Sequence, residues 1–176
     1  MAEIEIHASP EHAADAFSRG VSIMVAVVGV VLAVVTIASH RAHTASVIHR
    51  TEANDEWTYY QAKKIREHLL DVASSLAATM AASDAQKARA LAQTFAKDRD
   101  RYAREAQDIQ HDAQDRDDAS EREEARALRF DVGEGFLELG LVLSSLYFLS
   151  KRKFFPVLGG LAAVFGAAVS ASNWLI

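Results

Sequence analysis

The sequence contains no cysteine and little proline, and both absences narrow what the protein can be. Without cysteine the chain has no disulfides, thiolate metal sites or cysteine nucleophiles. Between Val30 and Val132 neither proline nor glycine occurs, although these are the two strongest helix breakers. No long basic stripe is present and the net charge is −5, so we expect no nucleic acid partner.

Motifs that mark enzymes are also absent from the sequence. It has no phosphate-binding glycine loop, no HExxH zinc motif and no nucleophile elbow. We therefore expect neither catalysis nor a cofactor. His40 and His43 are spaced so that two imidazoles can share one helix face. A metal site would need further ligands, so we interpret this pair as interfacial and expect no metal.

Apolar residues gather instead near both ends of the chain. Residues 21–39 form an uncharged run close to the roughly 20 residues that a helix needs to cross a bilayer. The alternative is a cleavable signal peptide, which has a basic start and a shorter apolar core of about 7–15 residues. The polar tail before this run, residues 1–20, is mainly acidic. We therefore expect a retained transmembrane helix.

Two further spans are predicted at the C-terminal end, over residues 132–150 and 154–176. They are separated by a basic loop at 151–153, which makes them an antiparallel pair. Glycines in the last span give it a small-residue face suited to close helix packing. Short loops rich in Lys and Arg stay cytoplasmic. The N-terminus and this loop are therefore predicted to be cytoplasmic, and residues 40–131 to lie on the outer, periplasmic side.

The long region between the first and second spans, residues 40–131, is predicted to be helical. It leaves the membrane and must return to it, so it has to fold back as a hairpin. Equal arms place the turn near 81–85, where Ser83 can cap a new helix. Apolar residues recur three and four apart as in a coiled coil. These are Trp57, Tyr60, Ile65, Leu69, Val72, Leu76 and Met80. Since such a narrow stripe buries little surface, we expect a homo-oligomer.

Two groups of residues are candidates for function. Glu134 and Glu138 lie four apart in the second span, where carboxylates are costly. Glu138 could line an ion pathway or pair with a polar group on a neighbouring helix. Outside the spans, the distinctive patch is Trp57, Tyr59, Tyr60, Gln61 and Lys63. This patch could pack between arms or subunits, or contact a partner.

Two motifs resemble those of a bacterial family of uncharacterised membrane proteins, domain of unknown function 4337. The first is the aromatic-Gln-Ala-Lys segment within residues 54–66. The second runs from Arg129-Phe130-Asp131 through Glu134 and Glu138 towards the basic loop. The resemblance covers nearly the whole chain and implies the same order of spans. It implies no activity.

Together these features predict an all-α membrane protein with three transmembrane helices. A long extramembrane α-helical hairpin of coiled-coil type lies between the first and second. The expected location is a bacterial inner membrane, where the protein contacts lipid and other copies of itself; other protein partners are not indicated. The leading hypothesis is a homo-oligomeric scaffold or assembly protein. The alternative is an ion channel or transport component that uses Glu138.

Overall fold

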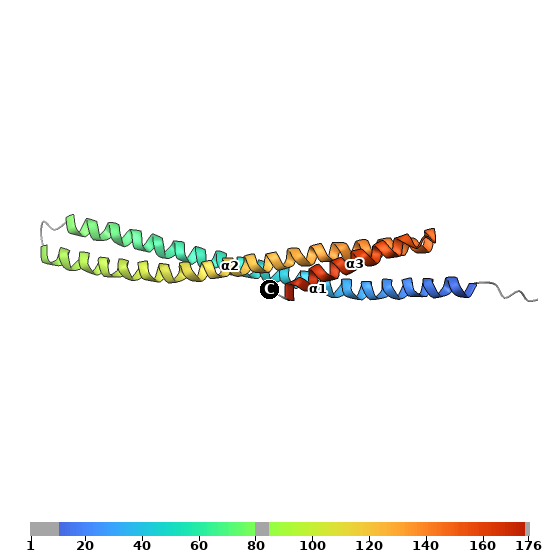
Figure 1. Ribbon diagram of the computed structural model, residues 1–176. Helices are drawn as coiled ribbons and strands as arrows, with labels where there is room; N and C mark the ends of the chain where they lie inside the picture. The colour runs from blue at the N-terminus through green and yellow to red at the C-terminus, as the bar shows by residue number, and fades with distance from the viewer. Residues whose placement is uncertain (1–10, 80–84, 175–176) are drawn as a thin grey trace, which may run out of the picture. The chain divides into compact units, whose positions relative to one another are not determined.

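The computed structural model describes residues 11–79 and 85–174, and this part of the chain is almost entirely helical. The elements in order are α1 (Glu11–Thr79), α2 (Ala85–Ser150), α3 (Phe154–Ala171) and the short 3₁₀ helix η1 (Ser172–Trp174), as Figure 1 shows. The predicted all-α class is therefore confirmed. By length and composition, α1, α2 and α3 are each long and apolar enough to cross a membrane.

The ends of the helices follow the local sequence. α2 ends at Ser150 and α3 begins at Phe154, so the basic residues 151–153 lie between them. Lys151 has a φ of 56°, and its N–H donates to the carbonyl of Tyr147 at 2.8 Å, which closes α2. The turn predicted near 81–85 falls where α1 gives way to α2. Residues 80–84, including the predicted cap Ser83, lie outside the described part.

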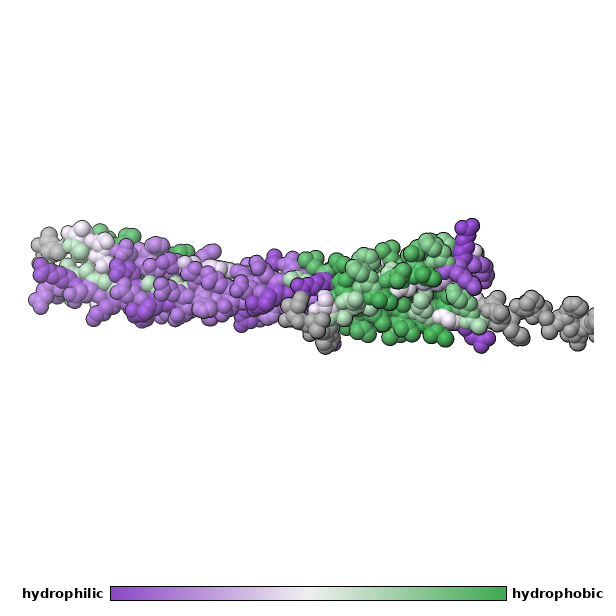
Figure 2. Space-filling view, in the orientation of Figure 1, coloured by the Kyte–Doolittle hydropathy of each residue, from purple (hydrophilic) through white to green (hydrophobic). Residues whose placement is uncertain are grey.

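The chain divides into two compact units. We call the described residues of Met1–His43 and Glu124–Ile176 the apolar unit, and Thr44–Glu123 the charged unit. α1 and α2 contribute to both. The hydropathy of the surface differs accordingly, because hydrophobic side chains cover the apolar unit and hydrophilic ones most of the charged unit (Figure 2).

In the apolar unit, α2 and α3 pack closely through two pairs of glycines. A Cβ at Gly140 would lie 2.8 Å from the carbonyl oxygen of Gly159, and one at Gly159 would lie 2.6 Å from that of Gly140. Gly133 and Gly166 form an equivalent pair, seven residues away on each helix. Any side chain at these positions would push the two backbones apart. Gly159 and Gly166 thus supply the small-residue face that the sequence predicted.

α1 completes the apolar unit with a regular row of buried side chains. Val21, Val28, Val35 and Ala42 recur every seven residues and are all less than 9% exposed. The last three of them belong to a core that includes Phe130 and Leu137 of α2 and Ala163 of α3. A strict seven-residue repeat is the pattern that keeps one helix face against a neighbour along its length.

In the charged unit, α1 and α2 run side by side in opposite directions (Figure 1). The Ser74 hydroxyl donates to the carbonyl of Ala92 at 3.2 Å, and that of Ser120 to the carbonyl of Ser46 at 3.0 Å. Among the described residues of this unit, every buried one is alanine or serine: Ser46, Ala53, Ala77, Ala106, Ala113 and Ser120. Small side chains therefore form the contact between the two helices.

Candidate functional site

A polar cluster joins α1 to α2 at one end of the predicted spans. The Thr36 hydroxyl donates to the Glu134 carboxylate at 2.6 Å, and that of Ser39 donates to Asp131 at 2.5 Å. The imidazole of His43 lies 3.0 Å from the second oxygen of Asp131. We call these five residues the span-edge cluster. It satisfies two carboxylates with donors from the facing helix.

The geometry of the span-edge cluster favours an ionised Asp131. The hydrogen bond from Ser39 lowers the pKa of this carboxyl, and the nearby His43 imidazole adds to the effect. Both His43 and Asp131 keep about half of their side chains exposed. The cluster therefore joins two helices while part of it remains exposed.

The two candidate glutamates in α2 have different surroundings. Glu134 is partly buried and accepts the bond from Thr36. Glu138, one turn further on, lies on the exposed face of α2. Within the described part of the chain, no residue forms a hydrogen bond or ion pair with its carboxylate. The structure therefore assigns a helix-joining contact to Glu134 and leaves Glu138 facing outwards.

The aromatic patch of the charged unit is mostly an internal contact. The Trp57 indole N–H donates to Asp117 at 2.8 Å, and its ring meets Tyr60 edge-on with centroids 5.6 Å apart. Lys63 donates to Glu105 at 2.5 Å and is only 11% exposed.

Aromatic rings also surround the ammonium group of Lys63. It lies 4.9 Å from the ring centroid of Tyr59 and 5.1 Å from that of Tyr102. The hydrogen bond with Glu105 raises the pKa of Lys63 and lowers that of Glu105. Tyr59 is half exposed and Gln61 is exposed, so the outer side of the patch is free for contacts that the chain itself does not make.

Further ion pairs link the two helices of the charged unit. Arg99 reaches Asp71 across the pair at 3.0 Å, and Arg116 contacts Glu52 in the same way. Pairs within α2 accompany them, such as Arg101 with Glu105. The part of α2 in the charged unit is thus a solvated helix that ion pairs also connect to α1.

An exposed apolar stripe is the other prominent feature of the charged unit. Ile65, Leu69, Val72 and Leu76 are between 57% and 65% exposed. Their spacing of four, three and four places them on one side of α1, away from Ser74 and Ala77, which face α2. We call these four residues the stripe. The sequence predicted them as coiled-coil residues, but small residues make the contact with α2 instead.

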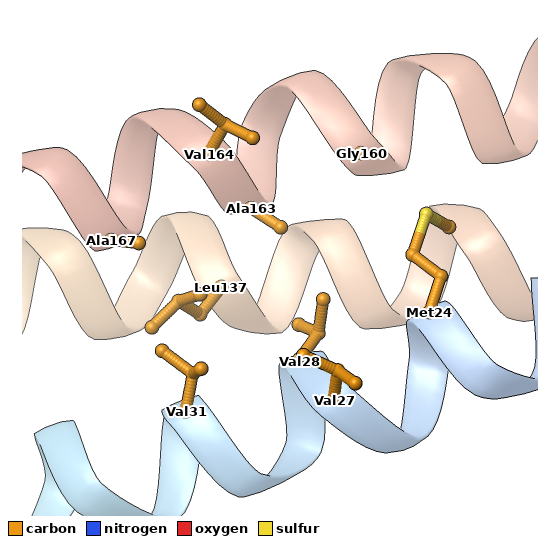
Figure 3. A pocket seen from close by; sticks show the side chains of 9 residues that line it. All are labelled: Met24, Val27, Val28, Val31, Leu137, Gly160, Ala163, Val164 and Ala167. Carbon is orange, nitrogen blue, oxygen red and sulfur yellow. The ribbon is translucent and has the colours of Figure 1, made fainter.

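An apolar groove lies between the helices of the apolar unit (Figure 3). Its volume is about 240 Å³, and its walls include Met24 and Val31 of α1, Leu137 of α2, and Gly160 and Val164 of α3. Gly160 therefore lines the groove, unlike Gly159 and Gly166, which contact α2. The residues that line the groove are all apolar.

The described residues contain no group of three or more His, Asp or Glu side chains that could hold a metal ion. His40 and His43 do not converge on a common point. The ring of His40 lies 2.9 Å from the carbonyl of Thr36 in its own helix, whereas His43 pairs with Asp131 of α2.

Sequence reasoning missed several residues of these contacts. Asp131 was recognised only as part of a motif, and Ser39 only as the end of a span. Asp117 and Glu105 could not be distinguished by sequence from the many other acidic residues in the charged part of α2. The signal in the sequence that could have located these contacts was the presence of the two family motifs, one in each helix. Each motif contains residues that join α1 to α2.

Comparison with known proteins assigns the chain to a family. The model of the family described as Domain of unknown function (DUF4337) matches residues 17–176. No curated protein and no solved structure matches significantly. The family match includes the span-edge cluster, the aromatic patch and α3. The chain therefore belongs to the DUF4337 family.

Proposed function

We propose that the protein is a homo-oligomeric membrane scaffold. Residues 21–39, 132–150 and 154–176 cross the bilayer, and residues 40–131 form a helical hairpin of coiled-coil type outside it. The hairpin mediates contacts between copies of the chain and contacts with partner proteins. The membrane is a bacterial inner membrane, with the loop at 151–153 in the cytoplasm and the hairpin in the periplasm. The basic charge of the loop supports this orientation.

The stripe is the observation that carries this proposal. Four large aliphatic side chains stay more than half exposed along one side of α1, in a unit rich in charged residues. Burying one such side chain fully stabilises an assembly by about 1.5–3 kcal/mol. Their spacing is that of the contact positions in a coiled coil. The same stripe on a second copy offers a matching surface.

The absence of cysteine allows a direct test of the stripe. Leu69→Cys should form a disulfide-linked dimer under mild oxidation in membranes. Ser75→Cys is the matched control, because Ser75 is exposed on the same helix but lies off the stripe. Equal cross-linking of the two variants, or none in either, would contradict assembly through the stripe.

The orientation can be tested with single cysteines as well. An impermeant maleimide added to intact spheroplasts should label Ser75→Cys and should label Ser150→Cys only after lysis. Labelling in the opposite order would reverse the proposed orientation.

A second candidate function is an ion channel or transport component. The outward-facing Glu138 supports it, since an unpaired carboxylate in a span often marks a hydrated pathway. Proteoliposomes would then show a proton or cation flux that falls strongly in Glu138→Gln. A flux equal to that of empty liposomes would rule out this candidate.

A further inference from the structure

Glu138 has an unusual position in the apolar unit. It lies six residues after Val132, which corresponds to about 9 Å along the helix axis. Its neighbours Leu139 and Val142 are 55% and 58% exposed, so the surrounding face of α2 is apolar. One turn earlier, Glu134 is already bonded to Thr36, which itself lies within the first predicted span. Glu138 is thus deeper in the predicted span than the last satisfied carboxylate.

A carboxyl group at this depth requires a hydrogen-bonding partner. Lipid chains supply none, and an unpaired carboxylate in hydrocarbon costs several kcal/mol. The described residues of the chain do not supply one either. A polar group at the same depth on another molecule would supply that partner.

A second copy of the chain meets this requirement. Copies inserted in one orientation place their Glu138 side chains at equal depth. A protonated Glu138 can donate to the carboxyl of its counterpart. Ser145 lies two turns further along the same exposed face, where it would lie opposite the Ser145 of the other copy. Such a contact is self-complementary, as symmetric assemblies require.

Gly135 provides an independent observation on the same face. A Cβ added there would meet nothing within 4 Å, whereas the Gly133–Gly166 and Gly140–Gly159 pairs have no room for one. Packing within the chain therefore does not explain Gly135. It lies three residues before Glu138, so the two share a side of α2. A glycine at this point allows the backbone of another helix to come close.

We propose that the face of α2 carrying Gly135, Glu138 and Ser145 is a contact between two copies of the chain within the membrane. Hydrogen bonds between their Glu138 side chains fix this contact. The inference rests on the proposed membrane scaffold but not on the stripe, which belongs to the charged unit. The two contacts can therefore be tested separately.

Two valines provide a matched pair for the experiment. Val142 of α2 and Val157 of α3 are both 58% exposed. They lie at the same level, because each is two residues from the Gly140–Gly159 contact. In native membranes, we expect Val142→Cys to cross-link at least about threefold more than Val157→Cys upon oxidation. Equal cross-linking, or none at Val142→Cys, would overturn the inference.

The role of the carboxyl group is tested in the Val142→Cys background. Glu138→Leu should reduce cross-linking about threefold to tenfold, the range expected for one interhelical polar contact. Glu138→Gln should retain it, since an amide both donates and accepts. An unchanged yield in Glu138→Leu would overturn the role of Glu138.

The Leu69→Cys cross-link serves as the control for folding and for the proposed function. If it persists in Glu138→Leu while the Val142→Cys cross-link falls, the variant is folded and the membrane contact alone is lost. If Leu69→Cys cross-links and Val142→Cys does not, the scaffold stands and this inference fails. If neither cross-links, both fail.

Discussion

The two units of the chain use small residues to bring helices together, but the small residues are of different kinds. In the apolar unit the contact between α2 and α3 depends on paired glycines whose backbones nearly touch. In the charged unit the contact between α1 and α2 depends on alanine and serine, and side-chain bonds such as Lys63 to Glu105 accompany it.

This difference agrees with the surroundings that we propose for each unit, lipid for the apolar unit and water for the charged unit. Among lipid chains, helices gain nothing by hiding apolar side chains from each other, so close backbone contact supplies the attraction. In water, a small-residue contact buries little apolar area, and charged pairs add specificity around it. Several large aliphatic residues remain exposed in the charged unit, and four of them form the stripe.

Substitution of a paired glycine should have the largest effect. Gly140→Ala places a Cβ against the Gly159 backbone, which cannot move unless the helices separate, and overpacking of this kind costs about 1–3 kcal/mol. Denaturant titration in detergent measures this loss. Gly29→Ala is the control, because its Cβ would meet nothing within 4 Å. Equal losses in both variants would contradict the close packing of α2 and α3.

The span-edge cluster should contribute less. Asp131→Asn removes a charge that accepts bonds from Ser39 and His43, and we expect a loss of about 1 kcal/mol because the site is half exposed. The same titration measures it, with the exposed Asp118→Asn as the control. No difference between the two variants would show that the cluster does not hold α1 to α2.

The Lys63–Glu105 pair should give a smaller, pH-dependent effect. Because folding lowers the pKa of Glu105, its contribution is present above the ordinary glutamate pKa and is lost as pH falls through the folded value. The thermal midpoint should therefore decrease between about pH 5 and pH 3. Glu105→Gln should weaken this decrease. An unchanged pH profile in Glu105→Gln would contradict the assignment.

The exposed side of the aromatic patch should matter least for stability. Gln61→Ala changes a side chain that points away from α2, so the free energy of unfolding should shift by no more than about 0.5 kcal/mol. A larger shift would indicate that the contact between the helices extends around this side of α1.

The sequence was sufficient to predict the helical class and three helices apolar enough to cross a membrane. Residues 40–131 contain neither glycine nor proline, and residues 21–39 carry no charge, so few alternatives were left. The sequence also located the family motifs. The sequence could not show which face of α1 contacts α2 in the charged unit. Both faces carry residues spaced three and four apart, as the contact positions of a coiled coil are. Ile65 and Leu69 are the larger hydrophobic residues, yet the buried positions belong to Ala53 and Ala77. Likewise, no pattern in the sequence showed that Glu134 meets Thr36 while Glu138 faces outwards.

The central claim is that copies of this chain assemble in a membrane, and the number of subunits tests it most directly. Native mass spectrometry of the full chain released from lipid nanodiscs should show a defined oligomer. Combining Leu69→Glu with Glu138→Leu should shift it to monomer. A wild-type chain that is monomeric both in nanodiscs and in mild detergent would contradict the account.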